Sequence, residues 1–124
     1  MRTFSFILLF TFLIGCSENQ SVNLSDEIEF GARYSIVMTS ALPTINNGTL
    51  VSKISYSGCN DSHEFELKNQ TANSIAELWL FKQTEDQPCD AYFEEEKTYN
   101  LSESILSAEN IVLITPSEDR ITLK

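Results

Sequence analysis

Apolar and polar residues alternate along much of the chain, a pattern typical of strands that bury one face and expose the other. The clearest case is the segment 63–68, where His63, Phe65 and Leu67 are expected to face the interior and the residues between them solvent. A second alternating segment covers residues 50–56. These periods of two predict strands rather than helices.

Residues 75–82 form a strand-length segment that is apolar on both faces, with Leu78 and Leu80 on one face and Trp79 and Phe81 on the other. A helix is the competing interpretation, but eight residues between polar turns favour a strand. A strand of this kind belongs in the middle of a sheet or has one face toward a partner. The sequence leaves these two alternatives open.

Turn signals separate the expected strands. Asn46-Asn47-Gly48 is typical of a tight turn because Asn and Gly tolerate positive φ. Residues 69–74 read as a polar turn, residues 83–88 as a loop that leads to Cys89, and residues 102–110 as a loop or a single helical turn. Further strands are expected in segments rich in β-branched and aromatic residues, at 34–39, 91–93, 98–99, 111–115 and 120–124.

Six or seven short strands with frequent turns predict a single all-β domain over residues 30–124. The spacing favours a small antiparallel β-sandwich or barrel.

The N-terminus has a different composition. Met1 and Arg2 form a basic tip, and residues 6–14 are apolar except for Thr11. An apolar run of about ten residues after a basic tip predicts a secretory signal and is too short to span a bilayer.

This segment ends on Leu13-Ile14-Gly15-Cys16, which resembles the lipobox of bacterial lipoproteins. The resemblance implies that residues 1–15 are removed as a signal peptide and that Cys16 is acylated as the first mature residue. Residues 16–29 are mostly polar and are expected to tether the lipid to the domain. An ordinary signal peptide with a chance cysteine is the alternative.

The chain is strongly acidic, with 18 Asp and Glu residues, eight Lys and Arg residues and a formal charge of −10. Removal of the expected signal peptide, which contains Arg2, would leave the mature chain with a formal charge of −11. Such a chain repels nucleic acid and anionic head groups, so we expect no nucleic-acid partner and membrane attachment through the lipid alone.

The expected location is the cell envelope. An Asp directly after the lipid cysteine resembles an inner-membrane retention signal, so Ser17 favours the outer membrane, facing the periplasm. Glu18 fits a surface-export signal, which keeps exposure at the cell surface as an alternative.

Two cysteines follow the lipobox, Cys59 and Cys89, and an even pair in an oxidising compartment predicts a disulfide. A zinc or copper site is the alternative, but zinc sites usually show tighter paired spacings than Cys59-x3-His63. Its further ligands would come from Asp61, Glu64 and Cys89. We therefore expect no metal. His63 is interpreted as a hydrogen-bonded, partly buried imidazole.

No catalytic constellation is evident. The one histidine lies in a predicted strand, no serine or cysteine stands in a nucleophile elbow, and the four glycines are scattered. We expect neither enzymatic activity nor a cofactor.

The most suggestive surface is an acidic run beside aromatic residues, the combination that a binder of a basic partner presents. A solvated charge run at the end of a strand is the alternative interpretation. The candidate partner-binding residues are Tyr92, Phe93, Glu94, Glu95, Glu96 and Tyr99.

Residues 50–101 resemble small disulfide-containing bacterial envelope lipoproteins. The resemblance rests on Ser57-Gly58-Cys59, on His63-x-Phe65-x-Leu67, and on a second cysteine, Cys89, followed by aromatic residues. That group brings no activity, so the resemblance implies a fold and a location only.

A shorter segment, Gly31-Ala-Arg-Tyr34, is similar to the Ser-Gly-x-x-Tyr segment of membrane-bound lysozyme inhibitors, with Phe30 in place of the serine.

Taken together, the lipobox and the lack of a catalytic constellation lead us to expect a lipid-anchored, non-enzymatic binding or structural module whose partner is another envelope protein. The alternative is an inhibitor of a basic enzyme such as lysozyme, for which the acidity is suitable.

Overall fold

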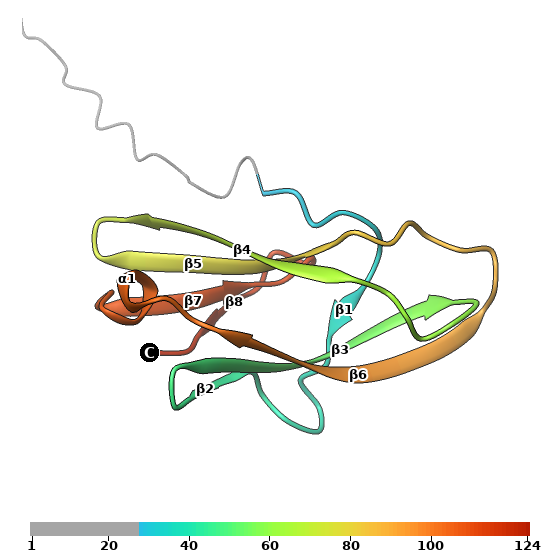
Figure 1. Ribbon diagram of the computed structural model, residues 1–124, viewed down its shortest axis with the longest axis horizontal. Helices are drawn as coiled ribbons and strands as arrows, with labels where there is room; N and C mark the ends of the chain where they lie inside the picture. The colour runs from blue at the N-terminus through green and yellow to red at the C-terminus, as the bar shows by residue number, and fades with distance from the viewer. Residues whose placement is uncertain (1–27) are drawn as a thin grey trace, which may run out of the picture.

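The structure is a computed structural model that describes residues 28–124. The expected signal peptide, Cys16 and most of the expected tether lie outside the described residues. Two four-stranded sheets lie against each other and enclose the core (Figure 1). The elements are β1 (Ser35–Ile36), β2 (Thr44–Asn46), β3 (Thr49–Gly58), β4 (Phe65–Ala72), β5 (Ile75–Lys82), β6 (Ala91–Asn100), α1 (Glu103–Leu106), β7 (Asn110–Ile114) and β8 (Arg120–Thr122).

The first sheet is built around β3. The long strand β6 pairs with one side of β3, and the short strands β1 and β2 share the other side. All pairs in this sheet are antiparallel. The inner face of β3 carries Leu50, Ile54 and Tyr56. All three side chains are buried, as the alternation of apolar and polar residues predicted.

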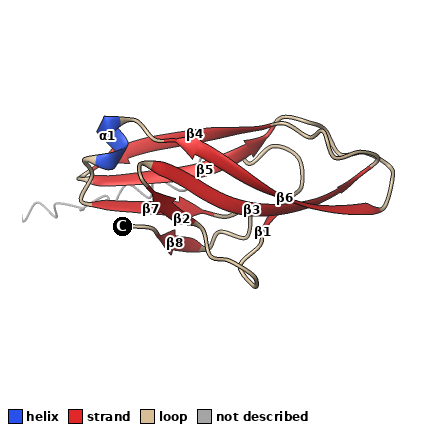
Figure 2. Cartoon of the chain, turned by 60° about the horizontal axis from the view of Figure 1, so that its bottom comes forward, coloured by secondary structure: helices blue, strands red, loops and turns tan. Residues whose placement is uncertain are grey.

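The second sheet has the order β4-β5-β7-β8, and its central pair, β5 and β7, is parallel. The chain leaves β5, forms β6 in the other sheet, and returns through α1 before β7 begins. This long crossover lets β7 run in the same direction as β5. Figure 2 shows α1 at the end of the sandwich where this return takes place.

The prediction of an all-β sandwich with one disulfide is confirmed. The prediction of six or seven antiparallel strands is wrong in two details, because the described residues form eight strands and one parallel pair. The two sheets of residues 28–124 do not close into a barrel.

Two hairpins turn through pairs of residues with positive φ. Asn47 and Gly48 have φ values of 48° and 76°, which confirms the predicted turn between β2 and β3. The predicted polar turn at residues 69–74 is wrong, because β4 continues to Ala72 and only Asn73 and Ser74 turn. Polar residues fit this part of β4 because it is an edge strand and its outer face meets solvent.

The core consists of two neighbouring clusters between the sheets. One includes Leu50, Leu78 and Leu113, and the other includes Ile54 and Leu80. β5 lies between β4 and β7, in the middle of its sheet, which is the first of the two alternatives that the sequence left open. Its Leu78–Leu80 face is buried, and Trp79 and Phe81 on the other face are half-buried.

The chain crosses between the sheets just before β1. Gly31 pairs with Lys82 at the end of β5, Phe30 O accepts from Lys82 N at 2.9 Å, and Ala32 N donates to Lys82 O at 3.2 Å. Four residues after Gly31 the chain is already part of the first sheet. The strand expected at 34–39 is shorter than predicted, because only Ser35 and Ile36 pair with β3.

Gly31 is required at the crossing. It has φ +73°, and a Cβ there would lie 2.2 Å from the carbonyl oxygen of Lys82. Gly31→Ala is expected to lower the free energy of unfolding by about 3 kcal/mol, because the pairing with Lys82 must break. Urea unfolding measures this effect.

Gly48→Ala is the matched control, since Gly48 has a similar φ of +76° but its Cβ would meet only the Leu106 side chain, at 3.3 Å. This variant is expected to cost about 1 kcal/mol from backbone strain alone. Equal losses in the two variants would contradict the proposed role of close packing at Gly31.

The disulfide Cys59–Cys89 joins the β3–β4 and β5–β6 connections, 30 residues apart in sequence. Cys59→Ser and Cys89→Ser are each expected to lower the free energy of unfolding by about 3.5 kcal/mol. The disulfide closes a loop of about thirty residues in the unfolded chain, so the wild type loses less conformational entropy on folding than either variant does. Urea unfolding of both variants, and of the wild type with and without reductant, measures the effect. An unchanged midpoint on reduction of the wild type would show that the disulfide does not stabilise the fold.

Candidate functional site

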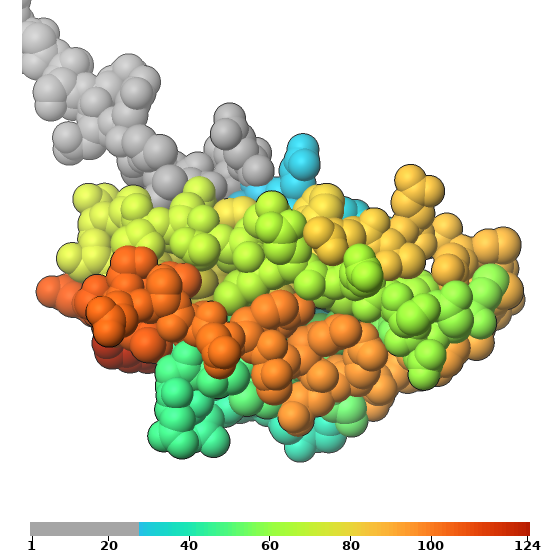
Figure 3. Space-filling model, in the orientation of Figure 1, coloured from blue at the N-terminus to red at the C-terminus, as the bar shows by residue number. Residues whose placement is uncertain are grey.

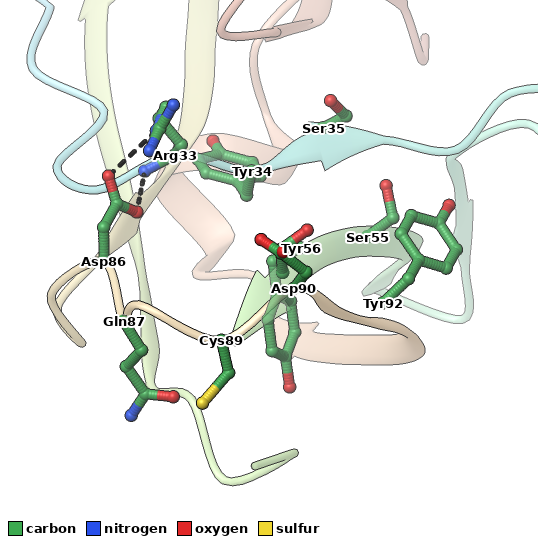
Figure 4. Close-up of a pocket in the computed structure, with 11 residues that line it drawn as sticks. Arg33, Tyr34, Ser35, Ser55, Tyr56, Asp86, Gln87, Cys89, Asp90 and Tyr92 are labelled. Carbon is green, nitrogen blue, oxygen red and sulfur yellow. Dashed lines mark hydrogen bonds and ion pairs between the residues drawn. The ribbon is translucent and has the colours of Figure 1, made fainter. Parts of the chain in front are cut away.

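A cavity of about 500 Å³ opens at the end of the first sheet where β1 diverges from β3 (Figure 4). Its walls come from the crossing segment before β1, from the end of β3, from the start of β6 and from the loop before β6. A cavity of this volume lies within the usual range for small-molecule sites. The lining residues are Arg33, Tyr34, Ser35, Ser55, Tyr56, Ser57, Asp86, Gln87, Cys89, Asp90 and Tyr92.

Gln87 fastens the loop 83–90 against the rest of the domain. Its Oε1 accepts a hydrogen bond from Cys59 N at 2.6 Å and lies 3.0 Å from His63 Nε2. Because Oε1 can only accept, His63 Nε2 donates to it. The disulfide holds the same loop at Cys89. This wall of the cavity is therefore tied down by covalent and polar contacts.

His63 packs behind that wall. Its ring is buried and stacks on Tyr56, with centroids 4.3 Å apart and planes 18° apart. The interpretation of His63 as a buried, hydrogen-bonded imidazole is confirmed. Its expected position within a strand is wrong, because β4 begins only at Phe65. Gly58 makes room for the ring, since a Cβ there would lie 2.6 Å from His63 Cε1.

A cluster of charges joins the same loop to the crossing segment. Asp86 accepts from Arg33 N and from Arg33 Nε, each at 3.0 Å, as Figure 4 shows. Behind them lies Lys82, only 1% exposed, whose Nζ donates to Arg33 O at 3.0 Å and lies 3.7 Å from Asp86. These contacts connect the crossing segment, β5 and the loop.

The pKa values follow from these contacts. Burial lowers the pKa of Lys82, although the charge of Asp86 opposes this effect. Hydrogen bonds from the backbone and side chain of Arg33 lower the pKa of Asp86. Asp86 is therefore ionised at neutral pH, since a carboxylate with a depressed pKa keeps its charge, and that charge faces the Lys82 amine.

Three serine hydroxyls lie on the cavity side of the first sheet. Ser35 and Ser55 are cross-strand partners, and Ser57 follows two residues later on the same face of β3. Ser55 is only 7% exposed, yet its hydroxyl makes no hydrogen bond with any residue of 28–124. A nearly buried hydroxyl that has no protein partner and lines a cavity is available to a ligand or to solvent.

Tyr92 stands at the rim as the most exposed large apolar side chain among the described residues, at 64%. Its hydroxyl donates to Glu94 Oε1 at 2.9 Å, and Glu94 Oε2 pairs with Lys53 Nζ at the same distance. Hydrogen bonds from Lys53 and Tyr92 lower the pKa of Glu94, which keeps it ionised as an acceptor. The orientation of this exposed ring is therefore held by two polar contacts.

The structure divides the candidate partner-binding residues between two faces of one strand. The acidic run lies inside β6 and not at the end of a strand, so alternate residues point in opposite directions. Tyr92, Glu94 and Glu96 are exposed on the outer face. In the space-filling view β6 (orange) forms a continuous part of the molecular surface (Figure 3).

The other three candidates face the second sheet. Phe93 packs on the core, Glu95 pairs with Lys97 at 2.7 Å, and the Tyr99 hydroxyl lies 3.4 Å from the Phe65 carbonyl oxygen. Burial, together with the charge of Glu95, raises the pKa of Tyr99 to about 12. In this fold these three side chains therefore serve the interior, and Tyr99 also contacts the first residue of β4.

Most of the cavity residues were not among the sequence candidates. Arg33, Asp86 and Asp90 lie in connections and carry no periodic signal, and the three serines read only as the polar face of strands. Cys89 and the candidate residue Tyr92 were the sequence signals that pointed to this end of the fold.

Within residues 28–124, no group of three His, Cys, Asp or Glu side chains is placed to hold a metal ion. The described part of the chain also contains no helix with the length and apolarity needed to cross a membrane. Comparison with protein-family models, curated proteins and solved structures finds no match to the chain.

The charge cluster generates a pH-dependent prediction. Asp86→Asn is expected to lower the free energy of unfolding at pH 7 by about 1–2 kcal/mol, because the buried ammonium of Lys82 loses its counter-charge. The value stays small because the Asp86 side chain is 41% exposed. The fold depresses the pKa of Asp86 below that of an aspartate in the unfolded chain. The ionised carboxylate therefore adds to the free energy of unfolding above the unfolded-state pKa, and this stabilisation is lost as the pH falls through the depressed pKa.

The difference between wild type and Asp86→Asn should therefore shrink below about pH 4 in urea unfolding. Arg33→Ala is the control, since it removes the exposed ion pair but leaves Asp86 beside Lys82, and it should cost less than Asp86→Asn. If the difference in the free energy of unfolding between wild type and Asp86→Asn does not change with pH, the stabilisation does not come from the ionised Asp86 carboxylate.

Proposed function

We propose that this protein is a lipid-anchored, non-enzymatic binding module of the cell envelope. The lipobox-like segment ending at Cys16 supports the anchor and the location, most simply at the outer membrane facing the periplasm. The observation that carries the binding role is the cavity of about 500 Å³ at the disulfide end, which has polar groups without protein partners and firmly held walls. A preorganised site loses little conformational entropy when its ligand binds.

The surroundings of the one histidine support a role without catalysis. A general base needs a free ring nitrogen within reach of a reacting group. His63 is not among the residues that line the cavity. Its ring is buried, its Nε2 is bonded to Gln87, and its Nδ1 is buried without a hydrogen-bond partner within residues 28–124, so neither nitrogen is open to the cavity. The other nucleophile candidates at the cavity, its serines, have no base paired with them among the described residues.

A second candidate function is inhibition of a basic enzyme such as lysozyme. It is supported by the exposed carboxylates of Glu94 and Glu96 on the outer face of β6 and by the charge of the chain. The segment Gly31–Tyr34 gives this candidate little support. Tyr34 is buried and its hydroxyl donates to Leu80 O at 2.6 Å, so the segment serves the fold here.

The proposal predicts that the cavity retains an envelope component. The full-length lipoprotein, held in detergent and immobilised, would be exposed to envelope extract and to a basic lysozyme at low and moderate salt. We expect a defined component to be retained at both salt concentrations and retention to fall at least tenfold in Tyr92→Ala and Asp90→Asn, since both change the cavity rim. Glu109→Gln is the matched control, because Glu109 is an exposed carboxylate near the opposite end of the fold.

Retention that is equal in the rim variants and the control would contradict the proposed site. Salt-sensitive retention of lysozyme that Glu94→Gln and Glu96→Gln abolish would favour the inhibitor instead, because ionic complexes weaken as salt screens the charges.

A further inference from the structure

The chemistry of the cavity lining narrows the class of ligand. Ser35, Ser55 and Ser57 present hydroxyls, and the Asp90 carboxylate makes no hydrogen bond or ion pair within residues 28–124. An apolar ligand would cover these groups and leave them without partners, which costs free energy at each one. The ligand therefore has to carry hydrogen-bond donors and acceptors of its own.

The charges at the cavity exclude strongly ionic ligands. Asp86 pairs with Arg33 and lies beside Lys82, so both cations at this end of the fold already have a carboxylate neighbour, which disfavours a phosphate or carboxylate ligand. A cationic ligand meets one free carboxylate, Asp90, but also the Arg33 side chain, which is 91% exposed at the rim. Counting these two basic and two acidic side chains, the site is neutral overall, which favours a neutral ligand.

The exposed ring of Tyr92 adds a flat apolar surface beside the polar lining. Its hydroxyl donates to Glu94, which in turn pairs with Lys53, and the ring is 64% exposed at the cavity rim. The two other tyrosines of the cavity lining cannot take this role. The Tyr34 ring is buried against Phe65, and the Tyr56 ring is stacked on His63.

We infer that the cavity binds a neutral saccharide. Sugar hydroxyls both donate and accept, so they can donate to the Asp90 carboxylate and exchange hydrogen bonds with Ser55 and Ser57. The apolar C–H face of a sugar ring can stack on Tyr92, as flat apolar surfaces do on aromatic rings. The volume of about 500 Å³ is suitable for a short saccharide.

This inference rests on the proposed function and names its ligand class. It predicts that the full-length lipoprotein in detergent binds at least one neutral disaccharide from a panel of di-N-acetylchitobiose, maltose, lactose and cellobiose, followed by NMR titration of backbone amides. Shifts are expected for the amides of Ser55, Ser57 and Tyr92. Inorganic phosphate, as an anionic probe, is expected to cause none of them.

The variants separate stacking from polar contacts. Tyr92→Ala is expected to weaken binding at least tenfold, Tyr92→Phe by a smaller factor because the ring remains, and Ser55→Ala by about threefold to tenfold from the loss of one hydrogen bond. Glu109→Gln and Thr122→Ala, both away from the cavity, are expected to leave affinity unchanged. Thermal unfolding of each variant checks that the fold is intact, and raising the salt concentration should leave the affinity of wild type nearly constant.

Two results would overturn the inference: no saccharide of the panel shifts the cavity amides, or binding persists unchanged in Tyr92→Ala. If saccharides fail but the rim variants still release the envelope component in the capture experiment, only the ligand class is wrong and the binding module stands. If both experiments fail, the cavity is not a binding site.

Discussion

Lys82 joins the two sheets at the end of the molecule that contains the cavity. Its backbone pairs with Phe30 and Ala32, and its buried ammonium donates to the carbonyl of Arg33 and faces Asp86. A buried ammonium costs a great deal of free energy unless its donors are satisfied. If the crossing segment and the loop before β6 moved apart, the Lys82 ammonium would be exposed or would lose its acceptors. The cavity opening between β1 and β3 therefore depends on the positions of these two segments.

A second set of contacts gives the cavity its stiffness. The disulfide holds the loop before β6 to the start of the β3–β4 connection, and Gln87 bonds to both Cys59 and His63 in the same place. The stacked rings of His63 and Tyr56 fill the space behind them, which is open only because residue 58 has no Cβ. Covalent, polar and packing constraints thus act on one wall, so that wall does not depend on any single contact.

The proposed role combines these features. A site with firmly held walls, an ordered exposed aromatic ring and unsatisfied hydroxyls is suited to recognition without chemistry. The acidic run contributes in two ways, since Glu94 holds the Tyr92 hydroxyl on the outside while Glu95 pairs with Lys97 between the sheets. Two of the three carboxylates of the acidic run therefore have structural contacts. The third, Glu96, is exposed on the outer face of β6.

Local features of this protein followed from the sequence because they depend on neighbours in the chain. The strand at 75–82, the Asn47-Gly48 turn and the strands expected at 111–115 and 120–124 were predictable from periodicity and turn propensity. The pairing of Cys59 with Cys89 is not local, and it was predictable only from the count of cysteines. Other features required residues that are far apart in sequence to meet. The parallel pairing of β5 with β7, the burial of Lys82, the division of the acidic run between two faces and the cavity itself were decided by tertiary structure. The physical reason is that periodicity shows which residues a strand can bury, whereas only the packing of the two sheets determines what those residues contact.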